Sequence, residues 1–281
     1  MKIELLTTFL EVSRTLHFRI ASESLFITQS AVSARIKLLE GELGVLLFDR
    51  SQKNLKLTSE GHRLIKHANE LIFMWQKTKQ DVGVADNTSE QLAIGSIMSI
   101  WDIILHKWLY KLHCNKHDLG LLTNTNSPIE LRRSVLNGVI DIAFLFDTPF
   151  VDELITEKVA TVPLHLVSTT EHLNIHQQTL SEYVMVDYGE SVNAQHIRAF
   201  QDTVTARHYM SQPSVALDFI LEAGGCAYMP MQLAYKHIQD KRLFLVKDAP
   251  VYSREIFAIY LARSQKKTLV EEAIQFFPEV S

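Results

Sequence analysis

The sequence has little cysteine and no long apolar run, and both absences narrow the class of protein. Its 281 residues include only Cys114 and Cys226, far apart in the chain, so no disulfide framework is expected. No stretch approaches the about 18 consecutive apolar residues of a membrane-spanning helix. The first helical stretch carries Glu4 and Glu11 and no small-residue cleavage site, which predicts an amphipathic helix and not a signal peptide. We therefore expect a cytoplasmic protein.

The common motifs of catalysis and of metal binding are also missing. The sequence has no phosphate-binding loop, no GxGxxG following a strand and no nucleophile elbow, so we expect neither an enzyme nor a cofactor. His113 and His117 lie four residues apart, close to His106 and Cys114, but no second ligand pair follows at zinc-site spacing. A solvated helix face explains these side chains, and no metal site is predicted.

Charge is distributed unevenly along the chain, although the net charge is only −4. Residues 1–80 hold 12 of the 28 Lys and Arg and 8 of the 32 Asp and Glu, a balance of +4. The rest of the chain holds the other 16 basic and 24 acidic residues, a balance of −8. A basic end on an acidic body is typical of a protein that contacts nucleic acid at one end only.

Helical periodicity predicts three helices near the N-terminus, over 3–13, 18–25 and 29–43. Thr28 is expected to cap the third helix through its hydroxyl, and Gly44 to end it. One stripe of this helix is apolar and should face a core: Val32, Ile36, Leu39 and Leu43. The opposite face carries short or polar side chains: Ser30, Ser33, Ala34 and Lys37. Such a face suits a DNA major groove, and an ordinary solvated helix face is the alternative.

The next segment is typical of a two-stranded wing. Residues 49–56 are polar and basic between apolar neighbours, with the turn expected at 51–54. In a wing, Arg50, Lys53 and Lys56 would face a phosphate backbone or a minor groove.

These residues together resemble the DNA-binding domain of the LysR-type transcriptional regulators. About twenty positions at fixed spacing carry the resemblance: Phe18, Ala21, Leu25, Thr28 to Ser33, Ile36, Leu39, Glu40, Leu43, Gly44, Leu47, Phe48, Arg50, Leu57, Thr58 and Gly61. Within that family, the amino-acid sequence of residues 5, 6 and 8–15 is similar to that of the HdfR subgroup of flagellar-operon regulators.

The resemblance implies a sequence-specific transcriptional regulator that binds double-stranded DNA in promoter regions through a winged helix-turn-helix. The side chains implied to read bases are Gln29, Ser30, Ser33 and Arg35 or Lys37. Those implied to hold phosphates are Thr28, Arg50 and Lys53. The family also implies self-association into dimers and tetramers, an unknown small-molecule effector and contact with RNA polymerase. The subgroup points to repression of flagellar genes, while activation or repression stays open from the sequence.

A long helix should follow the wing, within a linker over 59–88. Its apolar positions follow a heptad seam, interrupted at Thr78: Leu64, Ala68, Leu71, Trp75 and Val82. Such a seam favours a partner helix, and a helix packed on its own domain is the alternative. The family resemblance implies antiparallel pairing with a second copy. Residues 86–89 are polar and unpatterned, which predicts a hinge.

The remaining two hundred residues alternate between strands and helices, which predicts an α/β domain with parallel strands. Several segments are similar to the sensor domain of the same family: Asn126-Ser127, Leu131, Leu136 to Gly138, Asp141 to Ala143, and Gly225 to Pro230. The resemblance implies two lobes like those of periplasmic binding proteins, lobe I over 89–162 and 254–281 and lobe II over 163–253. The crossovers are expected near Val162 and Arg254. The predicted fold is thus a two-lobed α/β domain over 89–281, preceded by an all-α-rich winged helix-turn-helix domain over 1–58 and the linker helix.

The resemblance also implies an effector cleft between the lobes. Ligands of parallel sheets bind at the carboxyl ends of strands, and this rule gives the candidate residues. The candidates from lobe I are Ser96, Met98, Ser99, Asn124, Asn126 and Phe146. Those from lobe II are Ser168, Ser214 and Cys226. Helix capping is the alternative for each hydroxyl, and core packing for Met98 and Phe146. A buried strand thiol is favoured over a redox sensor for Cys226. No cation stands out in the cleft.

A different class of function stays open from the sequence. Two-lobed α/β domains also occur in solute receptors and enzymes, so the N-terminal helices would then serve only for assembly. An assembly helix would expose apolar side chains where the third helix carries Ser30, Ser33 and Lys37. That composition favours the regulator.

Overall fold

The computed structural model describes residues 2–49, 55–83, 90–147, 151–173, 175, 180, 182–200 and 206–278. The chain divides into two compact units, Met1–Ser89 and Glu90–Ser281, which are described separately. None of the helices in the described ranges is both long and apolar enough to cross a membrane.

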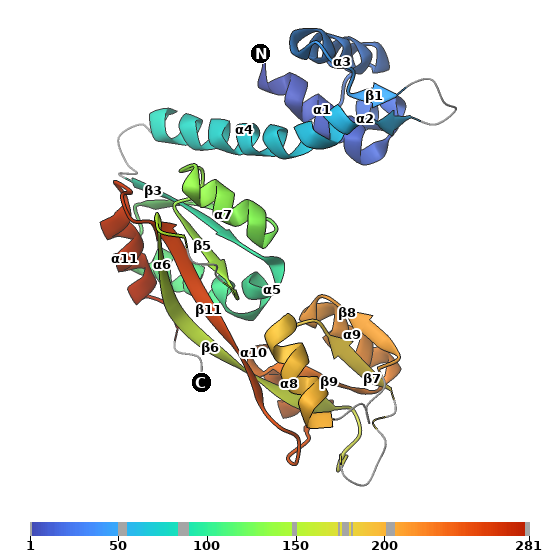
Figure 1. Cartoon of the computed structure of the whole chain (residues 1–281), viewed down its shortest axis with the longest axis vertical. Helices are drawn as coiled ribbons and strands as arrows, with labels where there is room; N and C mark the ends of the chain where they lie inside the picture. The colour runs from blue at the N-terminus through green and yellow to red at the C-terminus, as the bar shows by residue number, and fades with distance from the viewer. Residues whose placement is uncertain are drawn as a thin grey trace. The chain divides into compact units, whose positions relative to one another are not determined.

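Three short helices, a two-stranded wing and one long helix form the N-terminal unit (Figure 1). Their bounds are α1 (Ile3–Thr15), α2 (Phe18–Ser24), α3 (Gln29–Leu43), β1 (Phe48–Asp49), β2 (Lys56–Leu57) and α4 (Ser59–Gly83). The three helices lie where the periodicity predicts them, within two residues at each end. The core of the unit joins the helices to the wing, since the rings of Phe9 and Phe48 lie 5.7 Å apart beside buried Val32 and Ile36.

The buried stripe of α3 differs from the prediction at its last turn. Val32, Ile36 and Leu39 are fully buried, whereas Leu43 is exposed and Glu40 is buried instead. Glu40 Oε1 accepts hydrogen bonds from the backbone amides of Leu47 at 2.9 Å and Phe48 at 3.3 Å. These amides belong to the segment that turns into the wing, and a buried amide without an acceptor is costly. Glu40 therefore couples α3 to the wing. A pattern of apolar residues does not predict this role, because a glutamate is not expected to be buried.

Gly61 lets α4 approach the wing closely. A Cβ at this position would lie 2.3 Å from the carbonyl oxygen of Leu47 and 2.7 Å from a methyl carbon of Leu57. No side chain fits there without moving the backbone. The start of α4 therefore packs directly against the wing.

Further along α4 the expected seam is divided between core and surface. Ala68 is buried in the unit's own core and Leu64 packs against that core. Leu71 and Trp75 are 43% and 47% exposed. The side chain of Val82 lies outside the described part. The described portion of α4 thus presents two large apolar side chains that its own unit does not cover.

One mixed sheet runs through the whole C-terminal unit. Among the described residues its order is β4-β3-β5-β11-β6-β9-β7-β8, with β10 paired to β6. The strands are β3 (Glu90–Ser96), β4 (Leu119–Thr125), β5 (Ile142–Leu145), β6 (Leu154–Ser168), β7 (Tyr183–Val186), β8 (His208–Met210), β9 (Cys226–Pro230), β10 (Phe244–Leu245) and β11 (Tyr252–Leu261). The helices are α5 (Met98–Ile100), the π-helical η1 (Trp101–Leu105), α6 (His106–Asn115), α7 (Pro128–Leu136), α8 (Glu190–Phe200), α9 (Pro213–Ala223), α10 (Met231–Gln239) and α11 (Lys267–Gln275).

Two long antiparallel strands, β6 and β11, connect the lobes and run side by side along their length (Figure 1). Val162 pairs with Arg254, at the predicted crossovers. Lobe I adds β3, β4 and β5, which are parallel to one another, and lobe II adds the parallel strands β7, β8 and β9. The two-lobed α/β fold is thereby confirmed. The parallel prediction fails for β6 and β11, which run antiparallel to their neighbours.

Several elements escape the sequence patterns. Each connecting strand includes a stretch without an apolar run: residues 252–255 of β11 alternate buried and exposed side chains, and residues 154–158 of β6 are half-buried or exposed. The helices α8 and α10 were not predicted, and only Ala234 of α10 is fully buried. The strands β8 and β10 have three and two residues, too few for a periodic signal. Lobe II therefore depends more on tertiary packing than lobe I.

Candidate DNA interface and effector cleft

The N-terminus of α3 is capped as predicted. Thr28 Oγ1 accepts a hydrogen bond from the amide of Ala31 at 3.2 Å and lies 2.9 Å from Ser30 Oγ. Gln29, Ser30 and Lys37 are exposed, whereas Ser33 is half-buried between this face and the core. The structure thus brings four of the predicted DNA-contacting residues to one accessible side of α3, with Ser33 at its edge.

Arg35, the predicted alternative to Lys37 as a base-reading cation, contacts α1. Its guanidinium donates to Thr8 Oγ1 at 3.2 Å and lies 3.7 Å from Glu4 Oε2, both on α1. The side chain is only 32% exposed. Arg35 holds α3 against α1, so Lys37 is the cation on the accessible face. Residues two positions apart on a helix point to different sides, so Arg35 and Lys37 do not share one face of α3.

The wing begins with paired strands, Phe48 opposite Leu57 and Asp49 opposite Lys56. Thr58 anchors its end: its hydroxyl donates to the carbonyl of Leu46 at 2.8 Å and accepts from the amide of Gly61 at 3.0 Å. The predicted phosphate contacts Arg50 and Lys53 lie outside the described residues.

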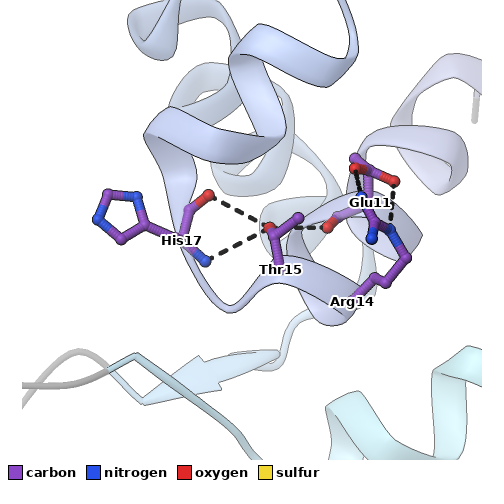
Figure 2. Close-up of polar contacts among 4 residues, drawn as sticks. All are labelled: Glu11, Arg14, Thr15 and His17. Atoms are coloured by element: carbon purple, nitrogen blue, oxygen red, sulfur yellow. Dashed lines mark hydrogen bonds and ion pairs between the residues drawn. The ribbon is translucent and has the colours of Figure 1, made fainter.

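The turn between α1 and α2 is held by a polar cluster (Figure 2). Arg14 donates to Glu11 at 2.6 and 3.2 Å, and this hydrogen bond lowers the pKa of Glu11 below its ordinary value. Thr15 Oγ1 donates to the carbonyl of Glu11 at 2.9 Å, and His17 caps α2 by accepting from the amide of Arg19. These contacts stabilise the last turn of α1 and the start of α2.

The carboxyl ends of β3, β4 and β5 meet at one edge of lobe I, because the three strands are parallel. Met98 is exposed there, and Ser99, Asn124, Asn126 and Phe146 are half-buried. Asn126 Nδ2 donates to Asn124 Oδ1 at 2.8 Å. The structure brings these five predicted residues to the expected edge.

Ser96 requires a correction. It lies at the end of β3 but is fully buried, and its hydroxyl donates to the carbonyl of Phe144 at 2.9 Å. The hydroxyl bonds to a carbonyl of the neighbouring strand and has no accessible surface that a ligand could contact. The prediction used only the position of Ser96 at the end of a strand. That position does not show whether the hydroxyl is bonded inside the sheet.

Ser168 and Cys226 are also corrected, because they lie at the far edge of lobe II. They pair with each other across β6 and β9, whereas Pro230 pairs with Leu164 near the crossover. The antiparallel direction of β6 therefore places Ser168 away from lobe I, and Cys226 starts its strand there. Cys226 is a buried thiol on β9, and this burial raises its pKa to about 12.

Ser214 takes part in a contact between the lobes. It lies in the first turn of α9, and its hydroxyl donates to Asp102 Oδ2 of η1 at 2.9 Å. Asp102 belongs to lobe I and was not predicted. This hydrogen bond joins the two lobes.

Arg254 is the cation that sequence reasoning missed. It lies on β11 at the crossover, is only 6% exposed, and its Nη1 and Nη2 donate to the two carboxylate oxygens of Asp147 at 2.9 and 2.8 Å. Its guanidinium carbon lies 4.8 Å from the ring centre of Phe146. A signal existed in the sequence, since Arg254 occupies an inward position between Tyr252 and Ile256 in an alternating strand.

A cavity of about 400 Å³ opens beside this ion pair. Its lining residues are Ile97, Pro128, Arg132, Leu145, Phe146, Asp147 and Arg254. Lobe II closes on the other side of the arginine: a Cβ on Gly189, whose φ is +89°, would lie 2.8 Å from Arg254 Nη2. The volume is in the range that holds a small organic molecule. In the described part of the chain, no group of three His, Cys, Asp or Glu side chains is arranged to hold a metal.

The geometry defines a class of protein before any comparison. A winged helix-turn-helix with a polar, accessible third helix is a DNA-binding module. The same chain carries a two-lobed α/β unit with a cavity at its crossover. Together they describe a DNA-binding regulator with a ligand-binding domain.

Comparison with known proteins identifies the family. Residues 3–62 match the family described as "Bacterial regulatory helix-turn-helix protein, lysR family", and residues 85–281 match "LysR substrate binding domain". The HTH-type transcriptional regulator HdfR of Yersinia enterocolitica is 33% identical, over 98% of this chain and 96% of the relative. HdfR of Yersinia pestis is 32% identical over the same shares. The chain therefore belongs to the LysR family and is a LysR-type DNA-binding transcriptional regulator with an effector-binding domain, as the resemblance predicted.

Solved structures show the same fold. CbnR, a LysR family transcriptional regulator, superposes with a TM-score of 0.74 at 16% identity, over 98% of both chains. Full-length CbnR in complex with its target DNA gives 0.71 at 15% identity, over 99% of both chains.

Proposed function

We propose that the N-terminal face of α3 reads promoter DNA in the major groove. Gln29, Ser30, Ser33 and Lys37 contact base edges, and Thr28 holds a phosphate beside the capped helix end. Arg50 and Lys53 hold phosphates from the wing. The observation that carries this proposal is the exposure of short polar side chains and one lysine on α3, while the cation on the other side, Arg35, is held by α1.

The second part of the proposal is self-association through α4. Leu71 and Trp75 are large apolar side chains on the surface of this helix, and a second copy of α4 would cover them. The expected assembly is a homodimer with two winged helix-turn-helix domains, called heads below. The family resemblance extends it to a tetramer. The corresponding boundaries are 1–58 for DNA binding, 59–88 for dimerisation and 89–281 for effector binding.

The third part concerns regulation. A small molecule bound between the lobes shifts an equilibrium between assemblies that present the heads differently. Within the cytoplasm, the regulator acts on RNA polymerase at its promoters, and the similarity to HdfR proteins favours repression of flagellar genes. Loss of the protein without any change in flagellar transcripts would contradict that target.

Selection of genomic fragments by the purified full chain tests the proposal. The bound fragments are sequenced at two salt concentrations, because contacts to phosphate weaken with salt while base contacts discriminate between sites. We expect a few promoter sites with an interrupted palindrome that persist at the higher salt. Uniform binding that disappears at the higher salt would contradict sequence reading by α3.

A further inference from the structure

The cavity at the crossover contains an unusual set of charges. Two guanidinium groups, Arg132 and Arg254, and one carboxylate, Asp147, line a space whose other walls are apolar, among them Leu145 and Phe146. With these three groups ionised, the lining carries a charge of +1. An anion is the ligand that such a lining favours.

The pairing of Arg254 is uneven in burial. The guanidinium side chain is 7% exposed, whereas its partner Asp147 is 73% exposed. A buried cation needs a partner, because removing it from water without one is costly. A carboxylate that stays mostly in water keeps its hydration and exchanges readily with another anion.

Arg254 also retains unused hydrogen-bonding capacity. Asp147 occupies Nη1 and Nη2, while the buried Nε has no partner among the described residues. Because Nε is itself buried, the atoms that a ligand in the cavity could take over are the two Nη nitrogens that pair with Asp147. The paired contact of Asp147 is the one that a ligand carboxylate makes with an arginine.

We propose that this cavity binds a small organic monocarboxylate with an apolar body, and that Asp147 occupies the place of its carboxylate when the ligand is absent. The ligand carboxylate is held by Arg254 and Arg132, and its apolar body packs against Phe146 and Leu145. The proposal rests on the proposed function of the cleft and adds the ligand class and the internal competitor. Ligand binding thus exchanges one ion pair for another and leaves no buried charge unpaired.

The test uses the full chain with benzoate and acetate as probes and benzamide and acetamide as their neutral counterparts. Binding is measured by calorimetry up to about 10 mM in a chloride-free buffer. We expect benzoate to bind at least about tenfold more tightly than benzamide, because only the carboxylate pairs with the arginines. Benzoate should also bind more tightly than acetate, whose apolar body is smaller.

Three variants separate the roles of the charged groups. Asp147→Asn should tighten benzoate binding about fivefold, because the internal competitor loses its charge. Arg132→Gln should weaken binding by a similar factor. Arg133→Gln is the matched control, since Arg133 lies on the same helix but does not line the cavity, and it should leave binding unchanged. Arg254→Lys keeps the charge without the two-pronged contact and should abolish the preference for carboxylate over amide.

Equal binding of benzoate and benzamide, or the absence of binding by either carboxylate, would overturn the ligand class. Weaker benzoate binding in Asp147→Asn would overturn the competition. Thermal unfolding shows whether each variant folds. If Arg254→Lys does not fold, the binding measured with Arg132→Gln still decides whether the arginines hold the carboxylate. DNA selection by the unmodified chain is measured separately. If the chain selects promoter sites but does not bind benzoate, the ligand class is wrong and the regulator function stands.

Discussion

The candidate DNA-binding face and the candidate effector cavity differ in how far apart their residues lie in the chain. The candidates on α3 span only Thr28 to Lys37, within one helix. The cleft combines Phe146 and Asp147 after β5, Arg132 on α7 and Arg254 on β11, more than a hundred residues further on. A local site can be found from periodicity alone, whereas a distributed site depends on strand direction and register. Substitutions at single residues of each region test this difference.

The largest effect concerns Cys226, which the direction of β6 and β9 places away from the cleft. Its pKa is raised by burial to about 12, so at pH 8 its thiolate fraction is about a thousandfold lower than that of an ordinary thiol. The thiol stays neutral as pH rises until it nears the raised pKa. Iodoacetamide at pH 8 should therefore modify exposed Cys114 and spare Cys226. Mass spectrometry of the alkylated peptides checks this, and a denatured sample should show both modified.

On α3, Ser33→Arg should abolish specific DNA binding. The long side chain would enter the space between the helix and the groove, and we expect a loss of at least about a hundredfold in affinity for a selected site. Ser191→Arg on α8 adds the same charge in the other unit and serves as the control. Retained affinity in Ser33→Arg, measured by fluorescence anisotropy, would show that this face does not enter the groove.

The coupling of α3 to the wing depends on Glu40. Glu40→Ala leaves the buried amides of Leu47 and Phe48 without their acceptor, and we expect a loss of about 2 kcal/mol in local stability. Hydrogen exchange of these two amides measures the effect. Glu23→Ala, which removes only an exposed ion pair with Arg19, should leave their exchange unchanged. Unchanged exchange in Glu40→Ala would show that the carboxylate does not hold the wing.

A smaller effect is expected for the contact between the lobes. A double-mutant cycle with Asp102→Ala and Ser214→Ala should give a coupling of about 1 kcal/mol in unfolding free energy. The exposed ion pair between Lys158 and Glu255 provides the comparison, with an expected coupling below about 0.5 kcal/mol. Additive effects of the first pair would mean that the lobes are not joined there.

The smallest effect tests the wing. Arg50→Ala should weaken binding to all DNA sequences and lower the salt slope by about one unit, because one phosphate contact is lost. Titrations at four salt concentrations give the slope, with Arg198→Ala on α8 as the control. A slope equal to that of the unmodified chain would show that Arg50 does not touch phosphate.

The two regions also differ in how well the sequence predicted their details. The bounds of α1, α2 and α3 follow from apolar spacing and from the cap at Thr28, which are properties of neighbouring residues. Leu43 was wrongly expected in the core, since the backbone amides that make Glu40 the better buried residue belong to a later segment. The edge of lobe I was predicted because its three strands are parallel, while the antiparallel β6 reversed the expectation for Ser168 and Cys226.

By itself the sequence determined the family, the capped third helix and the two-lobed plan, because each rests on residues at short, fixed spacing. Only the tertiary structure decided which side chains serve a site and which serve the fold. It packed Arg35 of α3 against α1, turned Ser96 into the sheet and brought Arg254 beside Asp147. The physical reason is that burial and pairing depend on which strands become neighbours, and the spacing of residues along the chain does not contain that information.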